Sequence, residues 1–200
     1  MFKFENKPIV VYICFKPLGK TFLLEFIKSY KKFESGLDHD LLICFKFFKN
    51  NEEIFDWKKN IDLDFIEYID ENKLNDYDIG SYFRIAEKYS NNHMLFLNTY
   101  TKINSNNWLK IFANHYNKQR ILGAHGCFTS LPSQFFNFFY HDQSKIKQIY
   151  RGLKYLKDFK LFPNPHLRSN GIFLYSQNFL NLKLNRNKLE NKNYCMQFES

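Results

Sequence analysis

The chain reads DYDIGSYFRIAEKYSNNHMLFLNTYTKINSNNWL over residues 76–109, and this stretch predicts a turn, a helix, a strand, a polar loop and a second helix. Apolar residues recur at helical spacing up to Tyr89. The run at 94–97, MLFL, follows a cluster of turn residues, which is typical of a short buried strand. The polar residues 98–101, NTYT, come directly after it. Because open α/β sheets bind ligands at the carboxyl ends of their strands, we expect a binding site at this loop.

Strands and helices alternate along the rest of the chain. Residues 8–15, PIVVYICF, and 41–48, LLICFKFF, are continuous apolar runs, which are typical of parallel strands buried on both faces. An amphipathic helix is expected between them over residues 21–33, which completes a strand–helix–strand unit. The remaining expected elements are helices near 64–71, 107–116, 144–159 and 177–182, the last capped by Ser176, and strands over 120–124 and 171–175. This alternation predicts an α/β fold with a mostly parallel central sheet flanked by helices.

Length and composition set the scale of the fold. A chain of 200 residues, 44% of them hydrophobic, is long enough for one domain with a substantial core, and this composition excludes a disordered chain. We expect a single domain over residues 1–200, in which residues 183–200 form a polar C-terminal tail.

The net charge of +9 indicates a basic surface, which favours anionic partners such as nucleic acid, acidic lipid headgroups or phosphorylated small molecules. Lysine and arginine are scattered and form no tract of five or more. Nucleic acid is therefore not the expected partner, although a basic nucleic-acid binder stays open as an alternative.

The cysteines and the N-terminal residues favour a cytoplasmic protein. No two of the four cysteines form a C-x-x-C pair, so a zinc site is not expected, and Cys14 and Cys44 lie in apolar runs as small core residues would. Charged residues interrupt the first ten positions, unlike a signal peptide. No apolar run approaches the about 20 residues of a membrane helix. The inner membrane face is an alternative location for a basic protein.

Two common nucleotide-binding motifs are absent. No G-x-G-x-x-G follows the first expected strand. Residues 16–21, KPLGKT, end like a phosphate-binding loop but lack its first glycine at the required spacing. These observations exclude the usual dinucleotide and P-loop sites.

Four segments resemble nucleotide-sugar glycosyltransferases of the A-type fold, a family-2-like group, with the strongest likeness to the domain related to rhamnan synthesis protein F. The segments are 76–83 (DYDIGSYF), 96–100 with 107–109 (FLNTY and NWL), 123–126 (GAHG) and 162–170 (FPNPHLRSN). The likeness covers about residues 8–182, and 162–170 is its most specific part. It implies a transferase that moves a sugar from a nucleotide-diphosphate donor to a surface polysaccharide or lipopolysaccharide acceptor.

The metal motif of this group is altered here. A-type transferases usually carry D-x-D after the strand at 94–97, where the carboxylates hold Mg²⁺ or Mn²⁺. This chain has Asn98-Thr99-Tyr100, and an amide offers only a neutral carbonyl oxygen to such a cation. We therefore assign no metal-binding residue, and Mg²⁺ or Mn²⁺ stays open as a cofactor. A metal-free enzyme must neutralise the leaving diphosphate with cationic side chains and amide N–H groups.

The resemblance implies roles for named residues. Arg168 and His166 would stabilise the leaving diphosphate, and Glu199 would deprotonate the acceptor hydroxyl. The expected donor-binding residues are Asp76, Asp78, Gly80, Arg84, Asn98, Tyr100 and Asn170.

Each role has a structural alternative. Asp78 also suits a helix N-cap, and Asn98 suits an ordinary turn. The charges of His166 and Arg168 also suit a solvated loop, and Glu199 also suits a frayed terminus. In the resembling group the chain continues beyond a segment like 192–200, so we expect this one to be truncated. With the missing D-x-D, this keeps a non-catalytic carbohydrate- or nucleotide-binding remnant open as a second function.

Overall fold

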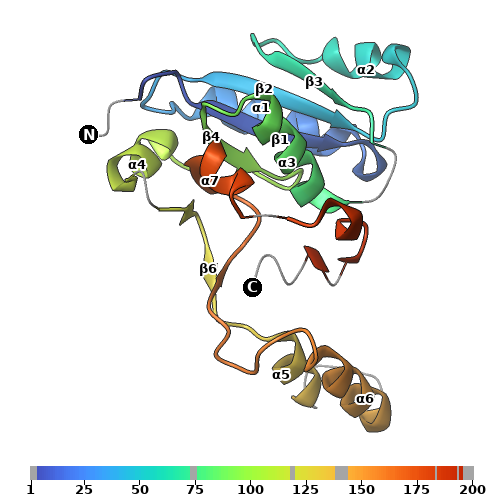
Figure 1. Ribbon diagram of the computed structural model, residues 1–200. Coiled ribbons are helices and arrows are strands. Elements are labelled where there is room, and N and C mark those ends of the chain that lie inside the picture. The colour runs from blue at the N-terminus through green and yellow to red at the C-terminus, as the bar shows by residue number, and fades with distance from the viewer. Residues whose placement is uncertain are drawn as a thin grey trace.

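The protein is a single α/β domain built on a six-stranded sheet, as a computed structural model shows (Figure 1). The structure describes residues 4–72, 76–117, 120–137, 144–182, 184–192 and 194–195. The strand order is β3-β2-β1-β4-β8-β5. The strands are β1 (Ile9–Phe15), β2 (Asp40–Lys46), β3 (Ile66–Asp70), β4 (His93–Leu97), β5 (Leu122–Gly123) and β8 (Ile172–Tyr175).

The sheet is mostly parallel, which confirms the fold class expected from the alternation of elements. β3, β2, β1 and β4 run parallel, whereas β8 is antiparallel to both β4 and β5. Dinucleotide-binding sheets add their last strands in chain order, 3-2-1-4-5-6. Here β8, which comes later in the chain, lies between β4 and β5. The strand order therefore differs from that of dinucleotide-binding sheets, in agreement with the missing glycine motif.

Helices cover both faces of the sheet. They are α1 (Lys20–Lys32), α2 (Asn51–Lys58), α3 (Tyr77–Lys88), α4 (Trp108–His115), α5 (Leu131–Phe136), α6 (Lys145–Tyr155) and α7 (Ser176–Leu180), with 3-10 turns at Lys16–Leu18 and Arg186–Lys188. Alternate residues of β1 face two separate cores, because successive strand side chains point to opposite faces. α3 and α7 cover one core, in front of the sheet in Figure 1, and α1 and α4 cover the other.

Two expectations for secondary structure are wrong. Residues 64–71 do not form a helix, because Ile66–Asp70 is strand β3, which pairs in parallel with β2 and alternates between partly buried and exposed side chains. The helix of this region comes earlier, as α2, which Asn50 caps by accepting a hydrogen bond from the Glu53 N–H. Ser176 does not cap α7; its hydroxyl accepts a hydrogen bond from the Asn92 N–H instead.

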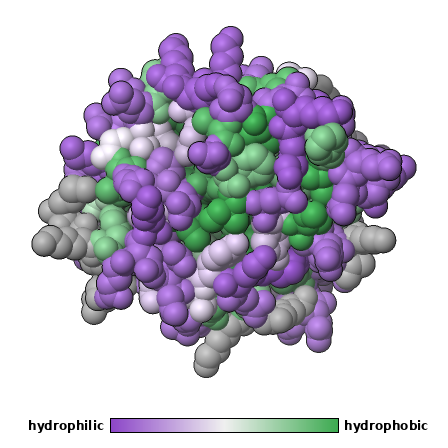
Figure 2. Space-filling model, turned by 90° about the horizontal axis from the view of Figure 1, so that it is seen from above, coloured by the Kyte–Doolittle hydropathy of each residue, from purple (hydrophilic) through white to green (hydrophobic). Residues whose placement is uncertain are grey.

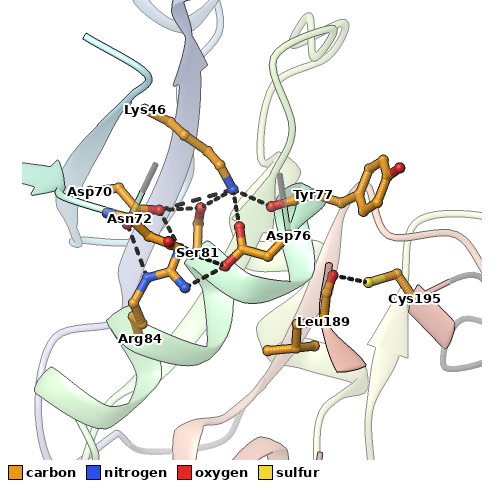
Figure 3. A network of polar contacts seen from close by, with 9 residues as sticks. All are labelled: Lys46, Asp70, Asn72, Asp76, Tyr77, Ser81, Arg84, Leu189 and Cys195. Atoms are coloured by element: carbon orange, nitrogen blue, oxygen red, sulfur yellow. Dashed lines mark hydrogen bonds and ion pairs between the residues drawn. The ribbon is translucent and has the colours of Figure 1, made fainter. Parts of the chain in front are cut away.

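Part of the segment expected to form a polar tail belongs to the core. Leu184, Leu189 and Cys195 are buried and join the cluster under α3 and α7. Leu189 accepts a hydrogen bond from the Cys195 thiol through its carbonyl oxygen (Figure 3).

Ile54 of α2 is buried in the same core cluster as residues of α1 and α4, and the Lys58–Glu67 ion pair joins α2 to the edge strand β3. Seen from above, where these elements are uppermost in Figure 1, apolar side chains gather in a central area that hydrophilic side chains surround (Figure 2). Phe55 and Ile69 are exposed apolar residues of α2 and β3.

Between β5 and β8 the chain leaves the sheet and forms an arm, which we define as residues 124–137 and 144–170. Figure 1 shows the arm as two chain segments that carry α5 and α6 away from the sheet. β6 (Gly126–Cys127) and β7 (His166–Leu167) pair in antiparallel orientation within it. α5 packs on α6, where the rings of Phe135 and Tyr155 stack at a centroid distance of 5.4 Å.

We expect Gly152→Ala to loosen the packing of α5 on α6. A Cβ at position 152 would lie 2.6 Å from Cε1 of Phe136, so the ring must move. Alanine favours the helix by about 1 kcal/mol over glycine, so a net loss of protection would show that the clash dominates. Hydrogen exchange should become faster in α5 and α6 and stay unchanged in β1. A Phe136→Leu background should suppress the effect, and equal effects in both backgrounds would contradict this explanation.

Candidate functional site

A cavity opens at the carboxyl ends of β1, β2 and β4. Its volume is about 250 Å³, and it is lined by Phe15, Leu18, Lys46, Tyr77, Asp78, Asn98, Thr99 and Tyr100. The strand order reverses between β1 and β4, and in open α/β sheets this switch point is where ligands bind. Three residues expected to bind the donor, Asp78, Asn98 and Tyr100, therefore lie together at the cavity.

A buried lysine lies beneath the cavity. Lys46, the last residue of β2, is 1% exposed and donates from Nζ to Asp76 Oδ1 at 2.6 Å and to Ser81 Oγ at 2.9 Å. Its third hydrogen bond goes to the carbonyl oxygen of Tyr77 (Figure 3). An ammonium group has three donors, so the protein's own acceptors use all of them.

Arg84 completes this ion network from the first turns of α3. Its Nε and Nη2 donate to the two oxygens of Asp70 at 2.9 and 2.6 Å, and its Nη1 donates to Asp76 (Figure 3). Both carboxylates raise the pKa of Arg84 against the opposing effect of burial. Two cations thus face two buried carboxylates, and the network is electrically neutral.

Asp76 is held ionised by this network. Burial alone would raise the pKa of its carboxyl, but the hydrogen bond from Arg84 and the charge of Lys46 outweigh burial and lower the pKa. Asn72 adds a hydrogen bond to Oδ2 at 2.7 Å. Buried ion pairs require such complete hydrogen bonding to offset their desolvation.

Gly80 makes room for the Asp76 carboxylate. A Cβ at position 80 would lie 2.0 Å from Asp76 Oδ2 and 2.1 Å from its Cγ. The N–H of Gly80 also donates to the Asp76 carbonyl at 3.0 Å. The structure thus places Asp76, Gly80 and Arg84, all expected to bind the donor, in the network under the cavity rather than among its lining residues.

The backbone beside Lys46 has an uncommon conformation. Three described residues other than glycine have positive φ, namely Phe47 (64°), Tyr77 (54°) and Asn107 (60°). Phe47 follows Lys46 in sequence, and Tyr77 accepts a hydrogen bond from it. Bulky residues rarely adopt this conformation, and such strain is often found at functional sites.

Asp78 is the carboxylate that faces the cavity. Burial raises the pKa of its side chain, and the nearby positive charge of Lys46 opposes that shift only in part. Its side chain does not cap α3, and no hydrogen bond or ion pair with it is found within the described ranges. A half-buried carboxylate without a partner is a suitable acceptor for N–H or O–H groups of a ligand.

The loop after β4 is tied to neighbouring elements. Thr99 donates through Oγ1 to the Ile13 carbonyl at 2.8 Å, and Asn98 Oδ1 accepts the Tyr100 N–H at 3.1 Å. Asn170 Oδ1 accepts from the Asn98 N–H at 3.2 Å and from Thr101 Oγ1 at 2.6 Å. This contact joins the segments NTYT and FPNPHLRSN, 72 residues apart, whereas Tyr100 is 58% exposed at the cavity and its ring contacts that of Phe22 edge-on.

The residues expected to act in catalysis lie elsewhere. His166 belongs to β7, where its Nδ1 contacts the Asn164 carbonyl at 2.8 Å. Arg168 is exposed next to this strand, and its Nη2 lies 3.5 Å from Cys127 Sγ. Neither lines the cavity. Glu199 lies outside the described residues.

The donor atoms at the cavity do not fit Mg²⁺ or Mn²⁺. Among the described residues that line it, Asp78 is the one carboxylate, and Asn98 Oδ1 already accepts the Tyr100 N–H. No group of three or more His, Cys, Asp or Glu side chains that could hold a metal ion occurs in the described part of the chain.

Sequence reasoning missed Lys46, Asp70 and Ser81. The one available signal was a lysine inside the apolar run LLICFKFF, because a charge in a strand buried on both faces requires a partner. Asp70 offered no comparable signal, because its segment was expected to be a helix.

Gly80→Ala should lower the free energy of unfolding by about 3 kcal/mol or more, because it displaces a buried carboxylate from two cations. Urea denaturation provides the measurement. Gly126→Ala is the matched control, since a Cβ there would meet no atom within 4 Å. The control should stay within about 0.5 kcal/mol of the wild type. Equal stability of the two variants would show that Asp76 has other room to move.

Asp78→Asn should raise the free energy of unfolding at neutral pH, because it removes a carboxylate whose ionised form is disfavoured by burial. Because the pKa of Asp78 is raised in the folded state, its protonated form favours folding, and that contribution is lost as the pH rises through the folded pKa. The difference from wild type should vanish as the pH falls to about 4.

Asp76→Asn provides the control for that pH series. The pKa of Asp76 is lowered in the folded state, so its ionised form stabilises the fold above the unfolded pKa. This variant should be less stable than wild type at neutral pH. The same sign of effect for both variants would contradict the assignment of Asp78 as a carboxylate without a partner.

Comparisons with known proteins are sparse. No family model and no curated protein matches the chain, so the resemblance to the rhamnan synthesis group remains a hypothesis from its motifs. Among solved structures, the mannosyltransferase Ktr4p from S. cerevisiae is similar with a TM-score of 0.47 and 11% identity. That match covers 98% of this chain, which spans 62% of the other.

Proposed function

We propose that this protein is a glycosyltransferase that moves a sugar from a nucleotide-diphosphate donor to a surface polysaccharide or lipopolysaccharide acceptor. The observation that carries the proposal is the cavity at the β1/β4 switch point, which combines the Asp78 carboxylate with the exposed ring of Tyr100. A carboxylate accepts hydrogen bonds from base or ribose groups, and an aromatic ring stacks on a base or sugar.

The cavity suits part of such a donor. Its volume of about 250 Å³ lies just below the roughly 300–1,000 Å³ of ligand pockets, so the nucleoside would fill it and the sugar would extend outward. Leu18 lines the cavity one residue before Gly19, the N-cap of α1. In our proposal the amide N–H groups at the start of α1 meet the diphosphate, as helix N-termini do for phosphate groups.

The proposed reaction uses the arm. The acceptor hydroxyl oxygen attacks the anomeric carbon, the bond from that carbon to the diphosphate breaks, and the hydroxyl proton passes to a base. In the proposal, Arg168 and His166 stabilise the charge of the leaving diphosphate. Asn170, two residues after Arg168, supports this role because it accepts hydrogen bonds from the loop after β4. Glu199 is our candidate for the base, on the strength of its motif.

One observation favours a second function, a nucleotide- or carbohydrate-binding protein without catalysis. The donors of Lys46 are all used within the protein, and no other cationic side chain of the described residues lines the cavity. If Arg168 does not reach the diphosphate, the site can bind a nucleoside but cannot neutralise a leaving group.

A thermal-shift panel of nucleoside diphosphates and nucleotide sugars tests the function. A ligand of the native state raises the melting temperature by mass action. We expect a shift with one nucleotide class that does not depend on Mn²⁺, and Tyr100→Ala should abolish it. Phe55→Ala, on the exposed face of α2, is the control and should keep the shift.

Turnover separates the two functions. Arg168→Ala should keep the thermal shift and lower sugar transfer by about 100-fold. A shift without turnover in the wild type would establish the binding protein instead. No shift with any nucleotide or nucleotide sugar would refute both the transferase and a nucleotide-binding protein.

A further inference from the structure

Helix α6 presents an apolar stripe to solvent. Ile146, Ile149, Tyr150 and Leu153 recur at i, i+3, i+4 and i+7, which places them on one face of the helix. Ile146 is 80% exposed, Tyr150 69% and Leu153 55%. Leu156 continues the stripe and is also exposed. Isolated exposed apolar residues are common, but a continuous stripe marks an interaction surface.

The stripe is not needed for the packing of the arm. α6 contacts α5 through another face, on which Gln148 and Gly152 are buried and Tyr155 stacks on Phe135. α5 and α6 also lie away from the central sheet in Figure 1, so the sheet does not cover the stripe.

The same segment is strongly cationic. Residues 144–162 contain six lysine or arginine side chains and one carboxylate, Asp158, a net charge of +5 out of +9 for the whole chain. Lys147 and Lys154 are exposed and lie on the helix beside the apolar stripe. A helix with an apolar face flanked by cations is typical of segments that lie in the plane of a membrane interface.

We propose that α6 binds the surface of an anionic lipid bilayer, with Ile146, Tyr150 and Leu153 inserted among the acyl chains and the flanking lysines at the headgroups. A second copy of the chain fits this surface less well, because it would bring two cationic segments together. Tyr150 suits the interface, since its ring is apolar and its hydroxyl is polar. This inference is independent of the proposed sugar transfer.

The helix lies on the bilayer rather than across it. Its 11 residues span about 16 Å, against about 30 Å for the hydrocarbon core. None of the helices in the described ranges is long and apolar enough to cross a membrane.

Vesicle flotation of the full chain tests the proposal. Vesicles of phosphatidylcholine alone are compared with an equimolar mixture of phosphatidylcholine and phosphatidylglycerol. We expect binding to the anionic vesicles only. Binding should weaken at higher salt, because the Debye length, over which charges attract one another, falls from about 8 Å at 0.15 M to about 3 Å at 1 M salt.

Two double variants of α6, each with a matched double variant elsewhere, distinguish binding through the α6 stripe and its lysines from binding through the overall positive charge. Ile146→Ser with Tyr150→Ser should lower the bound fraction about tenfold or more, whereas Leu24→Ser with Phe55→Ser, exposed elsewhere, should not. Lys147→Glu with Lys154→Glu should likewise lower binding about tenfold or more, whereas Lys28→Glu with Lys110→Glu, an identical change in net charge, should have little effect.

A fluorescent reporter guards against misfolded variants. Tyr150→Trp should show a blue shift of its emission when anionic vesicles are added, and Phe55→Trp should show none. Equal losses in the stripe and control pairs, absence of vesicle binding by the wild type, or an α6-dependent dimer without vesicle binding would each overturn the proposal.

Discussion

The buried network of Lys46, Asp76, Arg84 and Asp70 is the constraint on which the site depends (Figure 3). It connects the carboxyl ends of β2 and β3 to the first turns of α3, a helix that also packs on these strands through a shared apolar cluster. Removing one partner would leave a buried charge uncompensated, so the network fixes the start of α3 against the sheet. That position places Asp78 at the cavity, two residues after Asp76.

The network also explains why two neighbouring aspartates, Asp76 and Asp78, have different roles. Asp76 and Asp78 are two residues apart in one turn, yet their pKa values move in opposite directions. Cations surround the carboxylate of Asp76, whereas that of Asp78 is half-buried at the cavity without a partner among the described residues. The ion network that stabilises the fold thus lies beneath the cavity, and Asp78, which is suited to ligand binding, lies at the cavity. Functional side chains often lower stability, and other parts of the protein compensate for that loss.

Much of the fold could be predicted because long apolar runs and helical periodicity are local signals. The strands at β1, β2 and β4 and the helices α1, α3 and α4 are close to the ranges expected from the sequence. β3 could not be predicted, since it is a five-residue edge strand whose apolar residues also fit helical spacing. The position of Asn98 and Tyr100 at the cavity was predictable from the rule that ligands bind after buried strands, whereas Asp78 was expected to bind the donor only from the resemblance.

The sequence by itself determined the alternation of elements, the polar loop after β4 and the amphipathic character of α6, because each depends on residues near one another in the chain. The tertiary structure alone decided which polar side chains would be used internally. Arg84 and Asp76 turned inward because Lys46 and Asp70, 30 and 14 residues from their partners, meet them across the sheet. It also decided that the stripe of α6 stays exposed, since α5 packs on a different face of that helix and no local pattern encodes that choice.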